Sequence, residues 1–470
     1  MRRLTTVALM VTTAAAAPAG LGPASGPFAQ AASPTITLDP SRTYQTIIGW
    51  EASSRATTMP NRDLFLPMLA ELAVEAGINR IRLEISSGRE HERDTLGELH
   101  AGLISQQEYN GLWYATVNDN DDSDVINWNG FHFREIDMKV DQIVNPMRRL
   151  LEARGESLFV NATYVAFTRH NAPGARYVHD RPEEYAEFVL ATYIHLHQKY
   201  GWVPDTWEVI LEPNNTATWN PEYIGRAMVA AARRLREAGF TPRFVAPSTA
   251  RMDGAAPYFE RMMSVRGVRQ FVTELSYHRY QTRPQDAVRD LQRIADLARE
   301  HGVNTAMLEH IGSGHEELHQ DLKVGQVSAW QQFVLAPVGP WRRGIDNGGA
   351  LFVIDNSDPE RPQVVTMSRT RFLRQYFKFV RRGAVRIEAA TSNPAFDPVA
   401  FVHPDGGTVV VVKASSAGEF SLGNLPPGEY GVKFTTGVSY DVDAPDAVVA
   451  ADGVLTAAIP AAGVLTIYRK

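Results

Sequence analysis

The sequence contains no cysteine, so disulfide bonds, thiolate metal sites and cysteine nucleophiles are all excluded. It also has little excess of charge, because 53 acidic side chains face 47 basic ones and the net charge is −6. Such a balance lacks the excess of positive charge that binding to nucleic acid or to an anionic membrane surface requires. No segment after the first residues reaches the roughly 18 apolar residues of a spanning helix. We therefore expect neither a nucleic-acid partner nor a membrane partner.

The first residues carry a targeting pattern. Arg2 and Arg3 precede an alanine-rich apolar run that is too short and too often interrupted by proline and glycine to span a membrane. The stretch FAQAASP then offers an A-x-A cleavage site at Ala29 to Ala31. We predict a signal peptide over residues 1–32 and a secreted or periplasmic mature protein.

Short apolar runs alternate with amphipathic stretches between about residues 45 and 355, which is typical of repeated βα units on a parallel sheet. Two of the intervening stretches, 221–239 and 284–302, predict helices that end at a glycine. Eight such units indicate a closed (β/α)8 TIM barrel. The alternative, an open doubly wound sheet, lacks a glycine-rich phosphate loop after its first strand. The eight predicted strands are 45–50, 78–85, 157–165, 207–212, 243–248, 271–280, 304–310 and 349–355.

The composition changes after the barrel pattern ends. Short valine-rich runs punctuated by glycine and proline predict the hairpins of an accessory all-β sandwich domain, and the early stretch TITLDP at 35–40 is predicted to add a strand to it. A chain of 470 residues is long enough for two domains. The predicted organisation is a catalytic barrel over 44–383 and a sandwich over 33–43 plus 384–470, in a protein that we expect to be a monomer.

Two of the predicted strands end on a glutamate, Glu212 and Glu309. Side chains alternate between the faces of a strand, and the opposite face of each strand is wholly apolar at Trp207, Val209 and Leu211 and at Ala306 and Leu308, so both glutamates point into the barrel. The same alternation places Arg82, His278 and Tyr280 inside. Two carboxylates that face each other across a barrel mouth can cleave a glycosidic bond, one protonated and the other ionised. An arginine and a hydroxyl donor would keep Glu309 ionised, which makes it the nucleophile and Glu212 the proton donor.

These motifs resemble those of the clan A glycoside hydrolases, and most closely glycoside hydrolase family 30, over nearly the whole mature chain. The segment FKFVRRGAVRIEA also resembles that family's connection between barrel and sandwich. The resemblance implies a secreted, retaining β-glycoside hydrolase without a cofactor, which cleaves O-glycosidic bonds of a polysaccharide or glycoconjugate with Glu212 as acid/base and Glu309 as nucleophile. The resembling stretches are QTIIGW with Trp50, RIRLEI with Arg82, ILEP with Glu212, SYHRY with His278 and Tyr280, and MLEH with Glu309. Besides the two glutamates, we predict that the substrate is bound by Trp50, Arg82, His278, Tyr280 and Asn214.

Two positions depart from the family's pattern. The family usually has an asparagine directly before the acid/base glutamate, where it binds the sugar 2-hydroxyl, and this chain has Leu211. Glu51 stands where the family tends to have a glycine. Three interpretations of Leu211 stay open: Asn214 or Asn215, in the loop after Glu212, supplies the lost hydrogen bond, the substrate lacks a free 2-hydroxyl, or the protein is a poor catalyst.

The stretch 86–137 is much longer than an ordinary βα connection, and such loops lie on the catalytic face of a barrel. Its aromatic residues Trp113 and Trp128 predict a wall that packs against sugar rings. Its acidic run, residues 119–124, has oxygen ligands for calcium but lacks the glycine and the closing glutamate of a calcium loop. A solvated loop is the favoured interpretation, and we expect no metal site.

Two other functions stay open. The stretch HEELH at 315–319 matches the H-E-x-x-H pattern of zinc peptidases, in which two imidazoles share one helix face, but no third ligand follows at a familiar spacing. A non-catalytic carbohydrate-binding protein on the same barrel would explain Leu211 and would need only the aromatic residues of the cleft.

Overall fold

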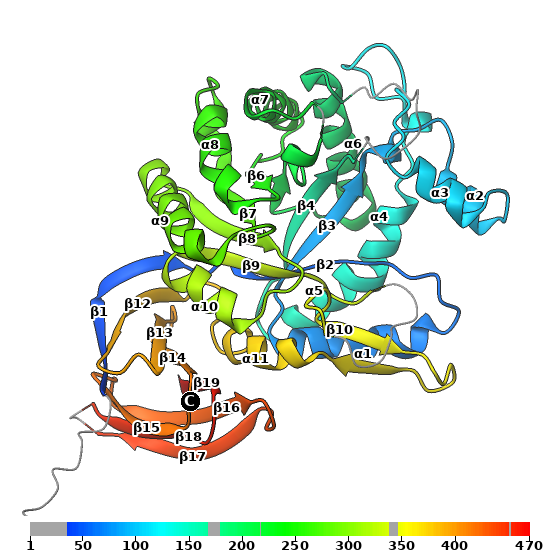
Figure 1. Cartoon of the computed structure of the whole chain (residues 1–470). Helices are drawn as coiled ribbons and strands as arrows, with labels where there is room; N and C mark the ends of the chain where they lie inside the picture. The colour runs from blue at the N-terminus through cyan, green and yellow to red at the C-terminus, as the bar shows by residue number, and fades with distance from the viewer. Residues whose placement is uncertain (1–34, 168–178, 217, 338–345, 451–452) are drawn as a thin grey trace, which may run out of the picture. The chain divides into compact units, whose positions relative to one another are not determined.

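The computed structural model describes residues 35–167, 179–216, 218–337, 346–450 and 453–470, so the predicted signal peptide lies outside the described residues. Eight parallel strands close into a barrel (Figure 1). The predicted TIM barrel is therefore confirmed. Its strands are β2 (Gly49–Ser53), β3 (Arg80–Ser86), β4 (Phe159–Val165), β5 (Thr206–Glu208), β6 (Phe244–Thr249), β7 (Val272–His278), β8 (Asn304–Glu309) and β9 (Val327–Val334).

Helices follow most of these strands and bury their apolar faces against the barrel. The two helices predicted at 221–239 and 284–302 are present as α7 and α9. After α9 the chain turns at Gly302 with φ 67°, a left-handed conformation that glycine adopts without steric cost. The outer helices are α1 (Arg62–Ala76), α4 (Arg134–Lys139), α5 (Asn145–Glu152), α6 (Pro182–Tyr200), α7 (Pro221–Glu237), α8 (Met252–Met263), α9 (Pro284–His301), α10 (His315–Lys323) and α11 (Ser368–Phe377). None of the helices in the described ranges combines the length and apolarity needed to cross a membrane.

One predicted barrel strand is wrong. The stretch 349–355 contributes β10 (Phe352–Asp355), which pairs with β11 (Gln363–Thr366) in a separate antiparallel hairpin. The eighth barrel strand is β9, which pairs with β8 on one side and β2 on the other. Strand β9 has the sequence VSAWQQFV, and the buried amides of Gln331 and Gln332 interrupt the apolar pattern on which strand prediction depends.

A nine-stranded sheet forms the second part of the protein, and its order is β17-β16-β19-β14-β13-β12-β1-β15-β18. Side chains from both ends of this sheet share one apolar core, so the sheet folds over as the predicted sandwich. The long strand β1 belongs to it and pairs with β12 and β15. The strands are β1 (Thr35–Thr46), β12 (Val385–Thr391), β13 (Phe396–Val402), β14 (Thr408–Ala414), β15 (Gly418–Gly423), β16 (Gly428–Thr436), β17 (Val442–Val449), β18 (Leu455–Ile459) and β19 (Gly463–Arg469).

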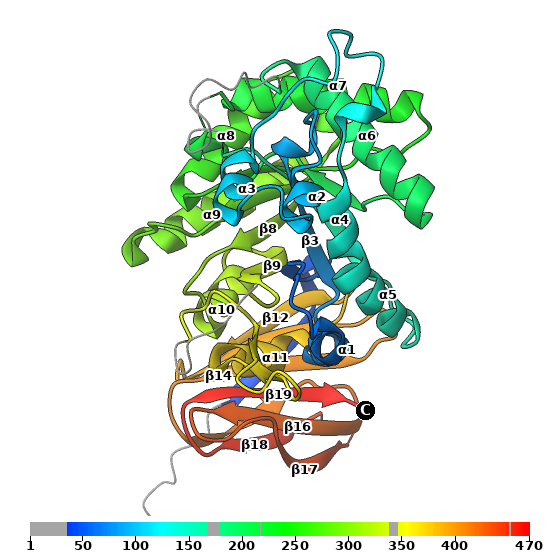
Figure 2. The same ribbon diagram turned by 90° about the vertical axis from the view of Figure 1, so that its right-hand side faces the viewer.

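The sandwich packs on the barrel through α11, which lies beside β19 and β16 (Figure 2). Gln375 of α11 donates to the Thr435 hydroxyl at 3.0 Å and accepts from the Thr466 hydroxyl at 2.9 Å. Apolar side chains such as Phe401 and Val464 join the core of the barrel. This packing makes Pro34–Lys470 one compact unit, and the predicted division at 43/44 and 383/384 stays a prediction.

Candidate active site

A cavity of about 780 Å³ opens among residues at and just after the carboxyl ends of the barrel strands. Its walls are mostly apolar and aromatic, with a few charged side chains converging in it, which is the usual composition of a ligand site. The charged lining residues are Arg55, Glu84, Glu212 and Glu309, and the larger apolar ones are Trp113, Tyr114, Val165, Phe167, Leu211, Ile311, Phe333, Val334 and Pro337.

Glu212 reaches the cavity through a turn after a short strand. Strand β5 ends at Glu208, but the following residues remain tied to their neighbours, since Leu211 N donates to Tyr164 O at 2.9 Å and Glu212 N donates to Ser248 O at 3.1 Å. Glu212 itself has φ 50° and ψ 60°, a left-handed conformation that costs a non-glycine residue about 1–2 kcal/mol. Such strain is found most often at functional sites.

Glu309 ends β8 and is held from two sides. The Tyr280 hydroxyl donates to Glu309 Oε1 at 2.9 Å, and the Arg82 guanidinium forms an ion pair with Oε2. Arg82 is fixed in turn, because it donates to the Ser53 hydroxyl at 2.8 Å and to Glu84 Oε1 at 3.0 Å. The carboxylate of Glu309 therefore has a cation at one oxygen and a hydroxyl donor at the other.

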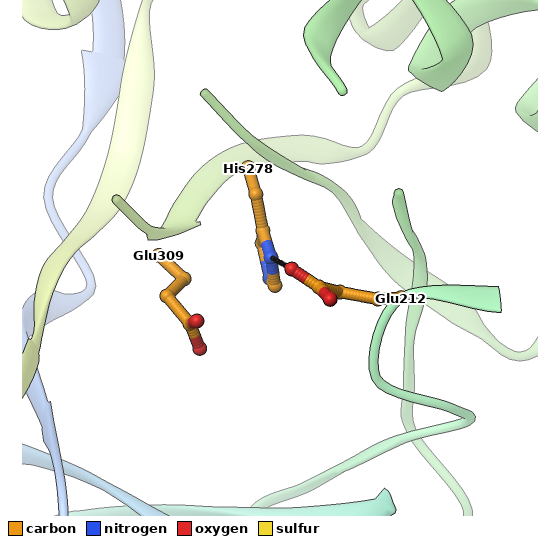
Figure 3. Close-up of side chains that lie close together, drawn as sticks. All are labelled: Glu212, His278 and Glu309. Atoms are coloured by element: carbon orange, nitrogen blue, oxygen red, sulfur yellow. Dashed lines mark hydrogen bonds and ion pairs between the residues drawn. The ribbon is translucent and has the colours of Figure 1, made fainter. Parts of the chain in front are cut away.

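Glu212, His278 and Glu309 point toward one another (Figure 3). His278 Nδ1 donates to Glu212 Oε1 at 3.0 Å, and one ligand atom from each of the three side chains lies within 4.8 Å of the others. Asn215 donates to the second oxygen of Glu212 at 2.7 Å. A divalent metal could accept these donor atoms, but Arg82 already supplies the positive charge at Glu309. The arrangement is better suited to acid/base and nucleophilic chemistry.

The charges of the site affect its titratable groups. Burial raises the pKa of Glu212, but the hydrogen bond and charge of His278 outweigh this, and the pKa lies below its usual value. Burial lowers the pKa of Arg82, yet the carboxylates of Glu309 and Glu84 raise it well above that of a free guanidinium, so Arg82 stays charged. Burial and the nearby charge of Glu309 raise the pKa of Tyr280, which therefore remains a hydroxyl donor.

The structure brings together only part of the predicted site. Trp113 lines the cavity beside Tyr114. Asn214 does not contact Glu212, because its side-chain oxygen accepts from Ala250 N at 2.9 Å, and the neighbouring Asn215 makes the contact instead.

The predictions for Trp50 and Trp128 as substrate-binding residues are not supported by their positions. Trp50 is fully buried, donates to Val380 O at 2.7 Å and stacks on Phe377 with ring centroids 4.8 Å apart. Its side chain thus packs toward the end of α11 and does not line the cavity. Trp128 is 45% exposed and lies with His132 at a separate, smaller hollow.

Sequence reasoning missed Arg55, Glu84 and Phe333 as lining residues. Arg55 donates to Glu84 Oε2 at 2.6 Å. Burial alone would raise the pKa of Glu84, but the charges of Arg55, Arg82 and Lys139 lower it to about 2. Glu84 shares the inward phase of Arg82, which was a usable signal, whereas Arg55 follows β2 in an irregular segment without periodicity.

The HEELH stretch has a structural role in α10. The ring of His315 stacks on Phe372 with centroids 4.6 Å apart, and buried His319 contacts the Tyr376 hydroxyl at 2.9 Å and Asp397 at 3.3 Å. Among the described residues, no three ligand atoms gather around these histidines. The stretch therefore joins α10 to α11 and β13, and the zinc hypothesis has no support from the site.

Comparisons with known proteins agree with this fold. Residues 383–434 match the family model of the glycosyl hydrolase family 30 β-sandwich domain. No curated protein matches the sequence. Solved structures match over nearly the full chain. A GH30 endoxylanase from Clostridium papyrosolvens C71 is 17% identical, with a TM-score of 0.62, and the match covers 93% of this chain and 100% of that one.

Two further structures extend the similarity. A glycoside hydrolase family 30 subfamily 8 xylanase from Clostridium acetobutylicum is 17% identical over 92% of this chain and 99% of its own, with a TM-score of 0.63. An endo-β1,6-glucanase is 16% identical over 93% and 94%, with a TM-score of 0.61. The class that the fold defines is a TIM barrel with a β-sandwich of the kind found in family 30 enzymes. The predicted resemblance to glycoside hydrolase family 30 is confirmed.

Proposed function

We propose that this protein is a retaining β-glycoside hydrolase that cleaves O-glycosidic bonds of a polysaccharide or glycoconjugate by double displacement. The observation that carries the proposal is the pair of carboxylates in the barrel mouth, with ligand oxygens of Glu212 and Glu309 within 4.8 Å of each other. Retaining enzymes place their carboxyl groups about 5–5.5 Å apart, whereas inverting enzymes leave about 6.5–9.5 Å for a water molecule.

Glu309 is the nucleophile in this proposal. Its contacts with Arg82 and Tyr280 fix its carboxylate at the cavity, and a carboxylate placed there can attack the anomeric carbon. The bond from the anomeric carbon to Glu309 forms as the bond to the leaving oxygen breaks. Water then cleaves the glycosyl-enzyme and frees Glu309.

Glu212 is the acid/base in this proposal. In the free protein, His278 lowers the pKa of Glu212. Glu212 therefore donates the proton as part of a pair with His278, which keeps that proton once a sugar has displaced water from the cavity. The negative charge of Glu309 favours the protonated form of Glu212. Formation of the glycosyl-enzyme removes that charge, which lets Glu212 act as a base toward water in the second step.

The substrate class rests on the cavity and on the similar structures. Trp113 and Tyr114 offer aromatic faces on which sugar rings can stack, and the similar solved enzymes act as endoxylanases and an endo-β1,6-glucanase. A β-linked polysaccharide is the proposed substrate. We also propose that the protein is secreted or exported to the periplasm, where it would meet such polymers.

One observation favours a second candidate, a non-catalytic carbohydrate-binding protein. Leu211 lines the cavity directly before Glu212 and cannot hydrogen-bond a sugar hydroxyl. A site that lost this interaction would still bind sugars through its aromatic wall while stabilising the transition state less well.

Hydrolysis assays on aryl β-glycosides and β-linked polysaccharides separate the two candidates. The wild type should release product, and Glu309→Gln or Glu212→Gln should lower kcat by about 100-fold or more. The exposed Glu419 on β15 provides the matched control, since Glu419→Gln should leave the rate unchanged. Saccharide binding without cleavage of any substrate would favour the binding protein.

A further inference from the structure

Charged side chains of alternating sign lead from the cavity wall to the proposed nucleophile. Arg55 donates to Glu84 Oε2 at 2.6 Å, and Arg82 donates to Glu84 Oε1 at 3.0 Å. Arg82 also forms the ion pair with Glu309, and the same nitrogen, Nη2, serves both carboxylates. Two arginines and two glutamates thus form a charge row in the order Arg55, Glu84, Arg82 and Glu309.

The members of the charge row differ in their exposure. The side chain of Arg82 is 0% exposed and that of Glu84 is 9% exposed, whereas the side chain of Arg55 is 23% exposed and lines the cavity. Burial alone would raise the pKa of Glu84, but the positive charges around it lower that pKa to about 2, so Glu84 is ionised at neutral pH. Arg82 is therefore the cation that depends most on bonded carboxylates, because a buried charge that has lost its partner is costly.

Other charged groups near the charge row have partners of their own. Lys139 Nζ donates to the backbone oxygen of Glu84 at 2.7 Å and pairs with Glu135 at 2.8 Å. Glu208 adds negative charge near Arg82, but its carboxylate accepts from two side chains of β4. In the described part of the chain, the carboxylates that bond Arg82 are the two of the charge row.

The proposed reaction changes the charge at one end of the row. In the first step the bond from Glu309 to the anomeric carbon forms, the bond to the leaving oxygen breaks, and Glu212 gives its proton to that oxygen. Glu309 is then a neutral ester, so Arg82 has lost one of its two carboxylates. In the second step water attacks the anomeric carbon, gives a proton to Glu212 and restores the carboxylate of Glu309. Between the two steps, Glu84 is the carboxylate that still bonds Arg82.

We propose that Glu84 is the counter-ion of Arg82 for the lifetime of the glycosyl-enzyme, a role that rests on the proposed function. With Glu309 esterified, the row holds two cations and one carboxylate. Glu84 compensates Arg82, so the surplus positive charge falls on Arg55, the member that is open to the cavity. Without Glu84 the surplus would fall on Arg82, which is fully buried. Glu84 is thus a positioning residue that acts through Arg82 and stabilises the covalent intermediate.

Trapping of the glycosyl-enzyme tests this role. The probes are 2,4-dinitrophenyl 2-deoxy-2-fluoro-β-xylobioside and the corresponding β-gentiobioside, used on the full chain. Mass spectrometry measures the rate of labelling and, after the probe is removed, the rate at which the label is lost. Peptide mapping should place the label on Glu309. The ratio of the two rates reports the stability of the glycosyl-enzyme relative to the free protein.

Glu84→Gln should change the two rates in opposite directions, because it removes the counter-ion and keeps the size of the side chain. Labelling should slow and loss of the label should accelerate, so their ratio should fall by roughly 10- to 100-fold, as expected for a lost hydrogen bond between charged groups. Glu84→Asp keeps the charge and should restore most of the ratio.

Arg55→Gln should shift the same ratio upward, because Glu84 then has Arg82 as its one bonded arginine and compensates it more fully. This variant keeps the test decisive if Glu84→Gln does not fold. A downward shift in Arg55→Gln would contradict the proposed distribution of charge along the row.

Glu274→Gln is the matched control. Arg80 lies two residues before Arg82 on β3 and donates to Glu274 at 2.9 Å, in a buried pair that has no bond to the charge row among the described residues. Glu274→Gln should lower the unfolding midpoint in urea and leave the ratio of rates unchanged.

Three results would overturn the role of Glu84 while the proposed function stands, provided that the wild type is labelled at Glu309. These are an unchanged ratio in Glu84→Gln, an equal slowing of both rates in that variant, and an equal fall of the ratio in Glu274→Gln. A wild type that takes no label from either probe would contradict the proposed function itself, and the role of Glu84 with it.

Discussion

The hydroxyl of Tyr280 makes the most specific contact with the proposed nucleophile, and its removal gives a quantitative prediction. Tyr280→Phe deletes one oxygen that donates to Glu309 at 2.9 Å and accepts from Ile311 N at 3.3 Å. A hydrogen bond to a charged group contributes about 1.5–3 kcal/mol. If the bond is fully formed in the transition state, kcat/KM should fall by roughly 10- to 150-fold. Arg82 remains in place, so the loss should be smaller than that caused by Glu309→Gln.

Tyr277, near the end of the strand β7 that precedes Tyr280, provides the matched control. Its hydroxyl donates to the buried Asp321 at 3.0 Å, and Asp321 also accepts from Trp330 Nε1 at 2.8 Å. Tyr277→Phe should therefore lower the free energy of unfolding by about 1–3 kcal/mol while leaving kcat/KM unchanged. Tyr280→Phe should show the reverse pattern.

Steady-state kinetics on the best aryl glycoside and urea unfolding of both variants supply the measurements. The ratio of kcat/KM values gives the loss in transition-state stabilisation, and the unfolding midpoint gives the change in stability. If Tyr280→Phe retains full activity, or if Tyr277→Phe loses as much activity as Tyr280→Phe, the contact between Tyr280 and Glu309 does not contribute to catalysis.

Two further predictions concern the binding of saccharide by the cavity wall and the stability of the protein in acid. Trp113→Ala should weaken saccharide binding by roughly 2- to 12-fold in a titration, from the loss of about 0.5–1.5 kcal/mol of aromatic stacking, whereas Trp128→Ala should bind as the wild type does because Trp128 lies outside the cavity. Equal losses in both variants would show that the wall is assigned wrongly. The pKa of Glu84 is lowered to about 2 in the folded protein, from about 4.5 in the unfolded chain. Ionised Glu84 therefore contributes on the order of 3 kcal/mol to the free energy of unfolding above pH 4.5, and this contribution is lost as the pH falls toward 2. Glu84→Gln should flatten that part of the stability curve in urea unfolding at pH 7, 4 and 3, and an unchanged curve would refute the assignment.

Most of the barrel strands could be predicted from the alternation of their side chains, because an outward apolar face and an inward polar face repeat with a period of two. It failed at β9, where Gln331 and Gln332 are buried and bonded to Ser53 and to Ser313 O. The sequence does not show that a polar side chain is buried when its hydrogen-bond partners come from other parts of the fold. The hairpin strand at 352–355 was apolar enough to take the place of β9 in the prediction.

The site was predictable to the extent that its residues end regular strands. Glu309, Arg82 and His278 lie on strands whose phase is readable, and the structure places Arg82 against Glu309 and His278 against Glu212. Arg55 lies in an irregular segment and Asn215 in the single 3-10 turn Pro213–Asn215, where no periodicity indicates direction. Trp50 was misplaced because the first strand was predicted to end at residue 50, whereas β2 begins at Gly49 and runs to Ser53, so Trp50 lies near the amino end of the strand and packs on Phe377.

Azide rescue of two variants tests most directly the claim that Glu309 is the nucleophile and Glu212 the acid/base. With an aryl β-glycoside that the wild type cleaves, Glu212→Ala should still form the glycosyl-enzyme, and azide should intercept it to give the β-glycosyl azide. Glu309→Gly cannot form a covalent intermediate, so azide should enter the vacated space and give the α-glycosyl azide by a single inversion. NMR of the two products gives their configurations. Exchanged configurations would reverse the two roles, and full activity in either variant would contradict the proposed mechanism.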